Sequence, residues 1–176
     1  TISASISTAD AAGNLGTASD TESYTVDTTA PTAAVAITAI STDTGSSSTD
    51  FITSDTTLTV SGTNGALGTG ERIEISADGG TTWNAVSVSG TTWTYNDTAN
   101  TRSADVTYQV RVIDLANNVG NTDSQLVDID TTAPSAPTIT GVRDDVTPVT
   151  GSLVDGASTN DTALAVTISL AGTGAV

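Results

Sequence analysis

The chain has 176 residues, with 20 acidic residues against four basic ones, all arginine, and a net charge of -16. Nucleic acids and anionic membranes are therefore excluded as partners, because phosphate binding requires clustered lysine and arginine. Cysteine, histidine and lysine are absent and no apolar run is long enough for a membrane helix, which excludes disulfides, zinc sites, membrane insertion and the usual nucleophile and base pairs of enzymes.

Short segments of alternating polarity predict seven β-strands in the middle of the chain. Their apolar residues lie two apart, as in Val35/Ile37 or Trp93/Tyr95, which is the pattern of a strand with one buried face. No window shows helical spacing. The strands are expected at residues 33–38, 56–61, 71–76, 84–89, 91–96, 105–113 and 125–130. Seven short strands with turn signals such as Asp78-Gly79-Gly80 and Ser89-Gly90 predict an all-β, immunoglobulin-like (Ig-like) sandwich.

An internal repeat divides the chain. The passage from Ile6 reads I-S-T-A-D-A-A-G-N-L-G and the passage from Val110 reads V-R-V-I-D-L-A-N-N-V-G, and each is followed by a strand that ends in D-T-T-A-P. Asp10 and Asp114 are 104 residues apart, and Asp27 and Asp130 are 103 apart. We therefore predict tandem Ig-like repeats of about 103 residues. Residues 1–28 are the closing strands of a first repeat, 29–131 a complete repeat, and 132–176 the opening part of a third.

The two incomplete repeats need partners. Neither piece can bury a core alone. We expect a longer parent chain, in which adjacent repeats of the same chain are the partners, or a fibre in which neighbouring copies complete the end repeats.

Acidic and amide side chains are expected to collect at the junctions between repeats. Calcium takes six to eight hard oxygen ligands, which loops rich in Asp and Asn supply. Several carboxylates at one junction repel each other unless a cation lies among them. The alternative is that these residues only cap turns. The candidate ligands are Asp10, Asn14 and Asp27 with Asp43, Asp50 and Asp55 at the first junction, and Asp114, Asn118 and Asp130 with Asp144, Asp145, Asp155 and Asp161 at the second.

The motifs resemble those of a known family. D-T-T-A-P at Asp27 and Asp130, D-x-A-x-N at Asp10 and Asp114, and D-G-G-T-T-W at Asp78 make the chain similar to the bacterial Ig-like repeats of giant biofilm-associated, type 1-secreted (RTX-type) adhesins. The resemblance implies an extracellular, non-catalytic, elongated rod that holds a distal binding domain away from the cell, with Ca²⁺ stiffening its junctions. Asn117 stands where this loop more often carries glycine, and asparagine adopts the same left-handed conformation.

Two other functions remain open. One is an Ig-like binding module for a carbohydrate or host protein, with Trp83 or Trp93 stacking on the ligand. The other is an accessory domain of a secreted polysaccharide-active enzyme. An exposed aromatic patch near Trp83 favours a binding module, whereas buried tryptophans and metal confined to the junctions favour a stalk.

Overall fold

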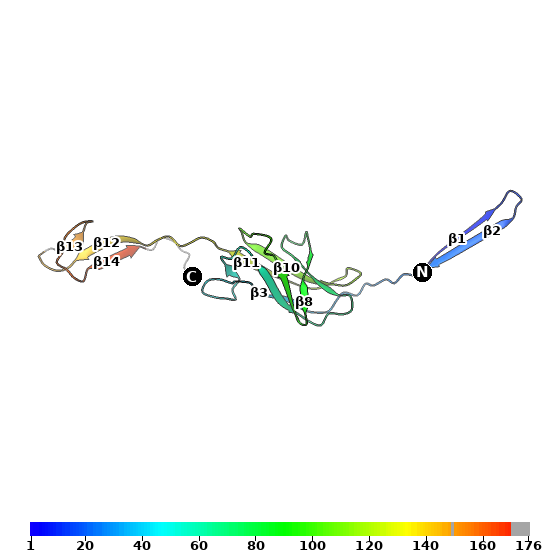
Figure 1. Cartoon of the computed structure of the whole chain (residues 1–176), viewed down its shortest axis with the longest axis horizontal. Coiled ribbons are helices and arrows are strands. Elements are labelled where there is room, and N and C mark those ends of the chain that lie inside the picture. The colour runs from blue at the N-terminus through cyan, green and yellow to red at the C-terminus, as the bar shows by residue number, and fades with distance from the viewer. Residues whose placement is uncertain (149, 170–176) are drawn as a thin grey trace.

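The structure is a computed structural model that describes residues 1–148 and 150–169 (Figure 1). Within this part of the chain all regular elements are strands, which form four sheets. The strands are β1 (Ile2–Ala9), β2 (Leu15–Glu22), β3 (Val35–Ile40), β4 (Ile52–Thr53), β5 (Thr59–Asn64), β6 (Arg72–Ser76), β7 (Asn84–Ala85), β8 (Ser87–Ser89), β9 (Thr92–Asn96), β10 (Val106–Ile113), β11 (Val119–Ile129), β12 (Thr138–Asp144), β13 (Gly151–Leu153) and β14 (Ala165–Ser169).

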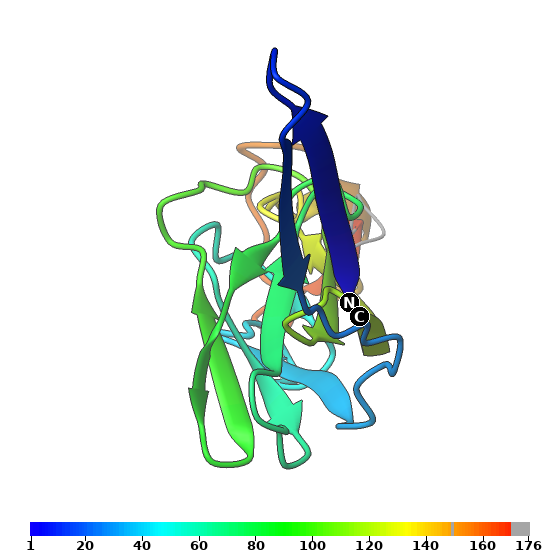
Figure 2. The same cartoon turned by 90° about the vertical axis from the view of Figure 1, so that its right-hand side faces the viewer.

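Strands β3 to β11 form a two-layered sandwich, here called the middle unit. One sheet has the strand order β4-β11-β10-β6-β7 and the other the order β3-β5-β9-β8. All of these pairs are antiparallel except β4 with β11, which is parallel. Figure 2 shows these strands from the side of the β1–β2 hairpin. The expected all-β, Ig-like sandwich is confirmed.

The core lies between the two sheets and consists of the alternating apolar residues. In β10, every second residue from Val106 to Val112 is buried, because successive side chains point to opposite faces of the sheet. Trp93 and Tyr108 are the largest fully buried side chains. Each buried aliphatic or aromatic side chain contributes about 1.5–3 kcal/mol to folding. Gly62 is required beneath Trp93, since a Cβ there would lie 2.5 Å from the indole ring.

The middle unit differs from the sequence prediction in three strands. The expected strand at 84–89 is two strands in different sheets, because β7 pairs with β6 and β8 pairs with β9. Val88, expected to be buried, is 41% exposed on this edge. The two-residue strand β4 was not predicted, and β11 begins six residues earlier than expected.

The strands outside the middle unit pair only among themselves. β1 and β2 form a hairpin, and β12 pairs with β13 and β14. The register of β12 with β14 shifts between Ile139 and Gly141, just as β3 with β5 shifts between Ile37 and Ala39. Residues 170–176 of the predicted third repeat lie outside the described residues.

The hairpin carries an apolar face without a core. Ile2 and Ile6 are 64% and 61% exposed. Their sequence equivalents in β10, Val106 and Val110, are 6% and 0% exposed. The same strand pattern is therefore covered by a second sheet in the middle unit and uncovered in β1.

Candidate functional site

Two turns of the same construction close the β1–β2 and β10–β11 hairpins. Asp114 ends β10, and its Oδ1 accepts a hydrogen bond from the backbone N–H of Asn118 at 2.9 Å, while its Oδ2 accepts one from Asn118 Nδ2 at 2.8 Å. Asp10 accepts the same two bonds from Asn14 at 2.9 and 2.8 Å. The Asn118 and Asn14 side-chain bonds, followed by backbone bonds, lower the pKa of both aspartates despite partial desolvation. Both carboxylates are therefore held in the ionised form.

A left-handed residue completes each turn. Gly13 has φ +82° and Asn117 has φ +65°. This confirms the prediction that asparagine takes the glycine conformation at residue 117. The local sequence D-x-A-x-N thus determines the turn, with the aspartate accepting and the asparagine donating.

Arg72 anchors the Asp114–Asn118 turn to the rest of the middle unit. Arg72 NH1 donates to the backbone oxygen of Asp114 and Arg72 NH2 donates to Asn117 Oδ1, both at 3.4 Å. Leu115 packs over Gly70, where a Cβ would lie 2.7 Å from the leucine side chain. The sequence prediction missed Arg72, although it is one of only four basic residues.

The turn at Asp114 meets the segment that leads into the middle unit. Asn118 Nδ2 donates to the backbone oxygen of Asp27 at 3.1 Å, across 91 residues of sequence. The carboxylate of Asp27 caps its own turn, with Oδ1 accepting from Thr29 N–H at 3.0 Å. Asn118 therefore brings the backbone oxygen of Asp27 to the Asp114 turn at the start of the middle unit, and we call Asp27, Asp114 and Asn118 the joint cluster.

The other candidates of the first predicted junction lie at the opposite end of the middle unit. The carboxylates of Asp43, Asp50 and Asp55 each accept a backbone N–H of a nearby residue, from Phe51, Ile52 and Thr57 respectively. Asp130 N–H donates to Thr53 O at the same end, and its Oδ1 accepts from Thr132 N–H at 2.8 Å. Asp50, Asp55 and Asp130 therefore cap local turns, whereas Asp43 bonds to a residue eight positions along the chain.

The predicted grouping of Asp114 and Asn118 with Asp130 is wrong. β11 joins them and is 11 residues long, which separates its ends by about 35 Å at 3.3 Å per residue. The turn of a hairpin lies at one end of its strands and the exit of the second strand at the other. For the same reason Asp10 and Asn14, at the tip of the β1–β2 hairpin, lie at the far end of β2 from Asp27.

The third group also lies away from Asp130. β12 runs from Thr138 to Asp144, so Asp144 and Asp145 lie at its far end. Asp144 is fully buried, with its carboxylate accepting from Val146 N–H and Thr159 Oγ1. Asp145 N–H donates to Asp161 Oδ2 at 3.4 Å. The expected approach of Asp144, Asp145 and Asp161 to Asp130 is therefore wrong, because β12 carries them away from it. Asp155 follows β13, which runs back along β12, and lies beside Ile139 and Thr140.

The described residues contain no group of three or more acidic, histidine or cysteine side chains placed to hold a metal ion. The joint cluster has two carboxylates and the amide of Asn118. A cation there would need backbone oxygens and water to complete its ligands. Calcium binding by the sequence candidates stays a prediction.

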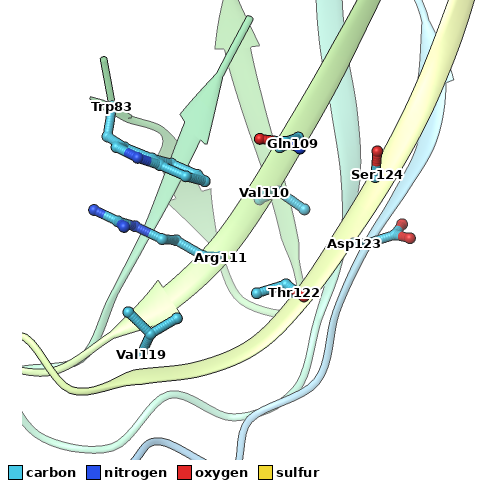
Figure 3. Close-up of a pocket in the computed structure, with 8 residues that line it drawn as sticks. All are labelled: Trp83, Gln109, Val110, Arg111, Val119, Thr122, Asp123 and Ser124. Atoms are coloured by element: carbon cyan, nitrogen blue, oxygen red, sulfur yellow. The ribbon is translucent and has the colours of Figure 1, made fainter. Parts of the chain in front are cut away.

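Trp83 and Trp93 differ in their surroundings. Trp93 is 1% exposed in the core. Trp83 lies half-buried on the outer face of the β10–β11 sheet, and Figure 3 shows its indole stacked over Arg111 beside Gln109 and Val119. The guanidinium carbon is 3.9 Å from the ring centroid, and Arg111 in turn pairs with Glu74 at 2.8 Å. Trp83, Gln109, Arg111 and Val119 line a shallow hollow on the outer face of the sheet. Arg111 covers the face of the Trp83 ring that borders this hollow, so a sugar cannot stack on that face without displacing the arginine.

A buried polar cluster was not foreseen. Asp97 is fully buried and accepts hydrogen bonds from Arg102, Tyr108 OH and Asn100 Nδ2. It ties the loop after β9 to the middle of β10. Desolvation, followed by the bond to the Asp97 carboxylate, raises the pKa of Tyr108. No local motif predicts this cluster, since Asn-Asp-Thr occurs at both 96–98 and 160–162.

Comparison with known proteins identifies the middle unit. The family model described as a bacterial Ig-like domain matches residues 29–131, which is more than half of the chain. No curated protein matches the chain. None of the described residues forms a helix long and apolar enough to cross a membrane. A match of this kind indicates a surface or extracellular module. The sandwich, its hairpin turns and this match together show that the chain belongs to the bacterial Ig-like domain family.

Proposed function

We propose that the chain is a structural stalk segment of a large bacterial surface adhesin or biofilm matrix fibre. It works outside the cell, as a rod of tandem Ig-like repeats that spaces a distal binding domain, and calcium stiffens the joint before the middle unit. The observation that carries the proposal is the bridge made by Asn118. Its side chain donates to the carboxylate of Asp114 in the middle unit and to the backbone oxygen of Asp27 in the segment before it.

The joint cluster offers the oxygens that calcium prefers. Asp114 Oδ1 and Oδ2 each accept one bond from Asn118, so the turn holds both carboxylate oxygens in fixed positions. Asp27 and Asp114 supply two negative charges, and Asn118 Oδ1 is the oxygen of a third side chain. Since two carboxylates are fewer than most protein calcium sites use, waters and backbone oxygens would complete the set.

Calcium would act on the joint in two ways. It would neutralise the charges of Asp27 and Asp114, and it would link the segment at Asp27 to the Asp114–Asn118 turn of the middle unit. If free calcium exceeds its dissociation constant about a thousandfold, binding stabilises the docked state by about 4 kcal/mol. In a chain without cysteine, this contribution would take the place of a disulfide.

The tandem arrangement is supported by the equivalence of the outer strands to strands of the middle unit. β1–β2 repeats the turn of β10–β11, and β12–β14 repeats the register shift of β3–β5. Exposed Ile2 and Ile6 correspond to core residues. In this proposal adjacent Ig-like repeats are the partners that cover these faces.

The test is calcium titration of the whole chain by calorimetry, with small-angle scattering and thermal melting in calcium and in chelator. We expect calcium to raise the melting temperature and to narrow the distribution of distances between the hairpin and the middle unit. Asp114→Asn should weaken calcium binding by about tenfold or more, because it removes one of the two charges in the joint cluster.

Asp10→Asn is the matched control. It makes the same change in the same type of turn, but away from the joint cluster. Its calcium affinity at the joint should equal that of the unmodified chain. Unchanged scattering and melting on adding calcium would refute the calcium joint, and equal loss of affinity in the two variants would show that Asp114 has no special part in it.

A further inference from the structure

The segment that leads into β3 contains buried residues before β3 itself begins. We call Asp27–Ala33 the leading segment. Pro31 and Ala33 are buried, although Asp27 to Ala30 are exposed. Pro31 lies against Gly120 of β11, where a Cβ would come within 2.8 Å of Pro31 Cβ and would collide with the Pro31 carbonyl oxygen. Glycine at residue 120 is therefore what allows the proline to approach.

Side chains of β11 hold the leading segment and the start of β3. Asn121 Nδ2 donates to the backbone oxygens of Thr32 and Ala33, both at 3.0 Å. Asp123 Oδ2 accepts from the backbone N–H of Ile37 at 2.8 Å. We call Gly120, Asn121 and Asp123 the docking strip. It binds an extended proline-containing segment by shape and side-chain hydrogen bonds, whereas the neighbouring strands pair by their backbones.

The chain contains the same linker sequence a second time without this contact. D-T-T-A-P recurs at Asp130 to Pro134, and residues 131–140 are all exposed. Local sequence and proline stiffness are the same in the two copies. In the first copy, burial of Pro31 and Ala33 coincides with their contacts to the docking strip.

We infer that the docking strip is a metal-independent clamp, which fixes the direction of the leading segment from Pro31 onward. The contacts that form it involve backbone oxygens, the Asn121 amide, a glycine and a single carboxylate, that of Asp123. Calcium then controls only the part of the joint before Pro31, where Asp27 is exposed. The hinge of a calcium-free joint lies between the end of β2 at Glu22 and Ala30. The inference rests on the proposed function only for this calcium-dependent half.

The experiment is ¹⁵N relaxation of the whole chain in calcium and in chelator. Thr32 and Ala33 should show order parameters near about 0.85 in both conditions, and Ser135 and Ala136, after the second linker copy, should fall below about 0.6. Residues Thr28 and Thr29 should be ordered only when calcium is present. The two linker copies in one molecule provide an internal comparison of identical sequence.

Asn121→Ala removes both amide hydrogen bonds and should bring the order parameters of Thr32 and Ala33 toward those of Ser135 and Ala136. Gly120→Val should do the same by displacing Pro31. Thr122→Ala is the control, since Thr122 is exposed and lines the hollow beside Trp83 on the outer face. Chemical shifts of the buried β10 residues report whether each variant is folded.

The outcomes separate the two proposals. Order at Thr32 and Ala33 that requires calcium would overturn the metal-independent clamp and leave the calcium joint standing. Equal mobility of the two linker copies would also overturn the clamp. Order at Thr32 and Ala33 with no calcium effect at Thr28 or Thr29 would support the clamp and overturn the calcium joint.

Discussion

Replacing Asp97 by alanine tests the buried polar cluster of the middle unit. The carboxylate is fully buried and accepts from Arg102 Nε at 2.8 Å and Asn100 Nδ2 at 2.7 Å, as well as from Arg102 NH2 and Tyr108 OH. Its removal leaves the Arg102 guanidinium, whose side chain is 23% exposed, without its counterion. Removing one partner of a buried ion pair costs about 3–5 kcal/mol. In a domain of about 100 residues this lowers the melting temperature by roughly 12–30 °C.

The assay is urea or thermal unfolding followed by circular dichroism, with Tyr108→Phe and the double variant completing a cycle. Tyr108→Phe alone should cost about 1.5–3 kcal/mol, since it removes one hydrogen bond to a charged group. Asp128→Ala, at an exposed residue of β11, should change stability by no more than about 0.5 kcal/mol. A loss below about 1 kcal/mol for Asp97→Ala would refute the reasoning, because it would mean that the loop relaxes and returns Arg102 to water.

Two further predictions concern the middle unit. The pKa of Asp78 is lowered to about 2, chiefly by the Thr82 side-chain hydrogen bond and then by Thr82 N–H. Because the pKa of Asp78 is lower in the folded state, the stabilising contribution of this carboxylate is present above about pH 4 and is lost as the pH falls toward 2. NMR titration should show that Thr82→Val raises the pKa of Asp78. An unchanged pKa would contradict the role of the Thr82 hydroxyl. Gly62→Ala should destabilise the middle unit by about 1–3 kcal/mol or more in urea unfolding, since the added methyl meets the Trp93 ring and the Ala36 backbone. A neutral effect would mean that Trp93 can shift.

Strand positions were predictable because alternation reports which face of a strand is buried. It does not report which sheet the strand joins. The run from Asn84 to Ser89 alternates throughout, yet it leaves β6 after Ala85 and joins β9 from Ser87. Sheet membership depends on partners distant in sequence, so Val88 fell on an exposed edge. β4 is two residues long and follows Phe51, which has φ +62°, and no periodicity can be read from so short a strand.

The candidate site was predictable at the level of single turns and not at the level of the assembled site. The aspartate and asparagine of each turn are four residues apart, as in Asp10 with Asn14 and Asp114 with Asn118. The geometry of the turn is therefore determined by the local sequence. Which turns meet depends on the end of the strand at which each lies. Asp130 leaves β11 at the end opposite to Asn118, a consequence of hairpin topology that spacing alone did not reveal.

The ion pairs of the described residues leave the joint cluster carboxylates out. Among the described residues, ion pairs join Arg72 and Arg111 to Glu74 and Arg102 to Asp97, all within the middle unit. The joint cluster carboxylates take part in none of these pairs and are held by hydrogen bonds. Arg72 approaches the turn through the Asp114 carbonyl and not through its carboxylate.

Measurements at high salt distinguish general screening of the acidic charges from neutralisation by a specifically bound calcium ion. General screening shortens the Debye length from about 10 Å at 0.1 M salt to about 3 Å at 1 M, and it would relieve repulsion at every acidic cluster of this chain equally. A bound calcium ion would act at Asp27 and Asp114 and would depend on the oxygens of both. If 1 M sodium chloride in chelator orders Thr28 and Thr29 as well as millimolar calcium does, the joint responds to screening alone. If only calcium orders them, and Asp114→Asn abolishes the effect, the stiffness of the stalk is set by a specific ion at this joint.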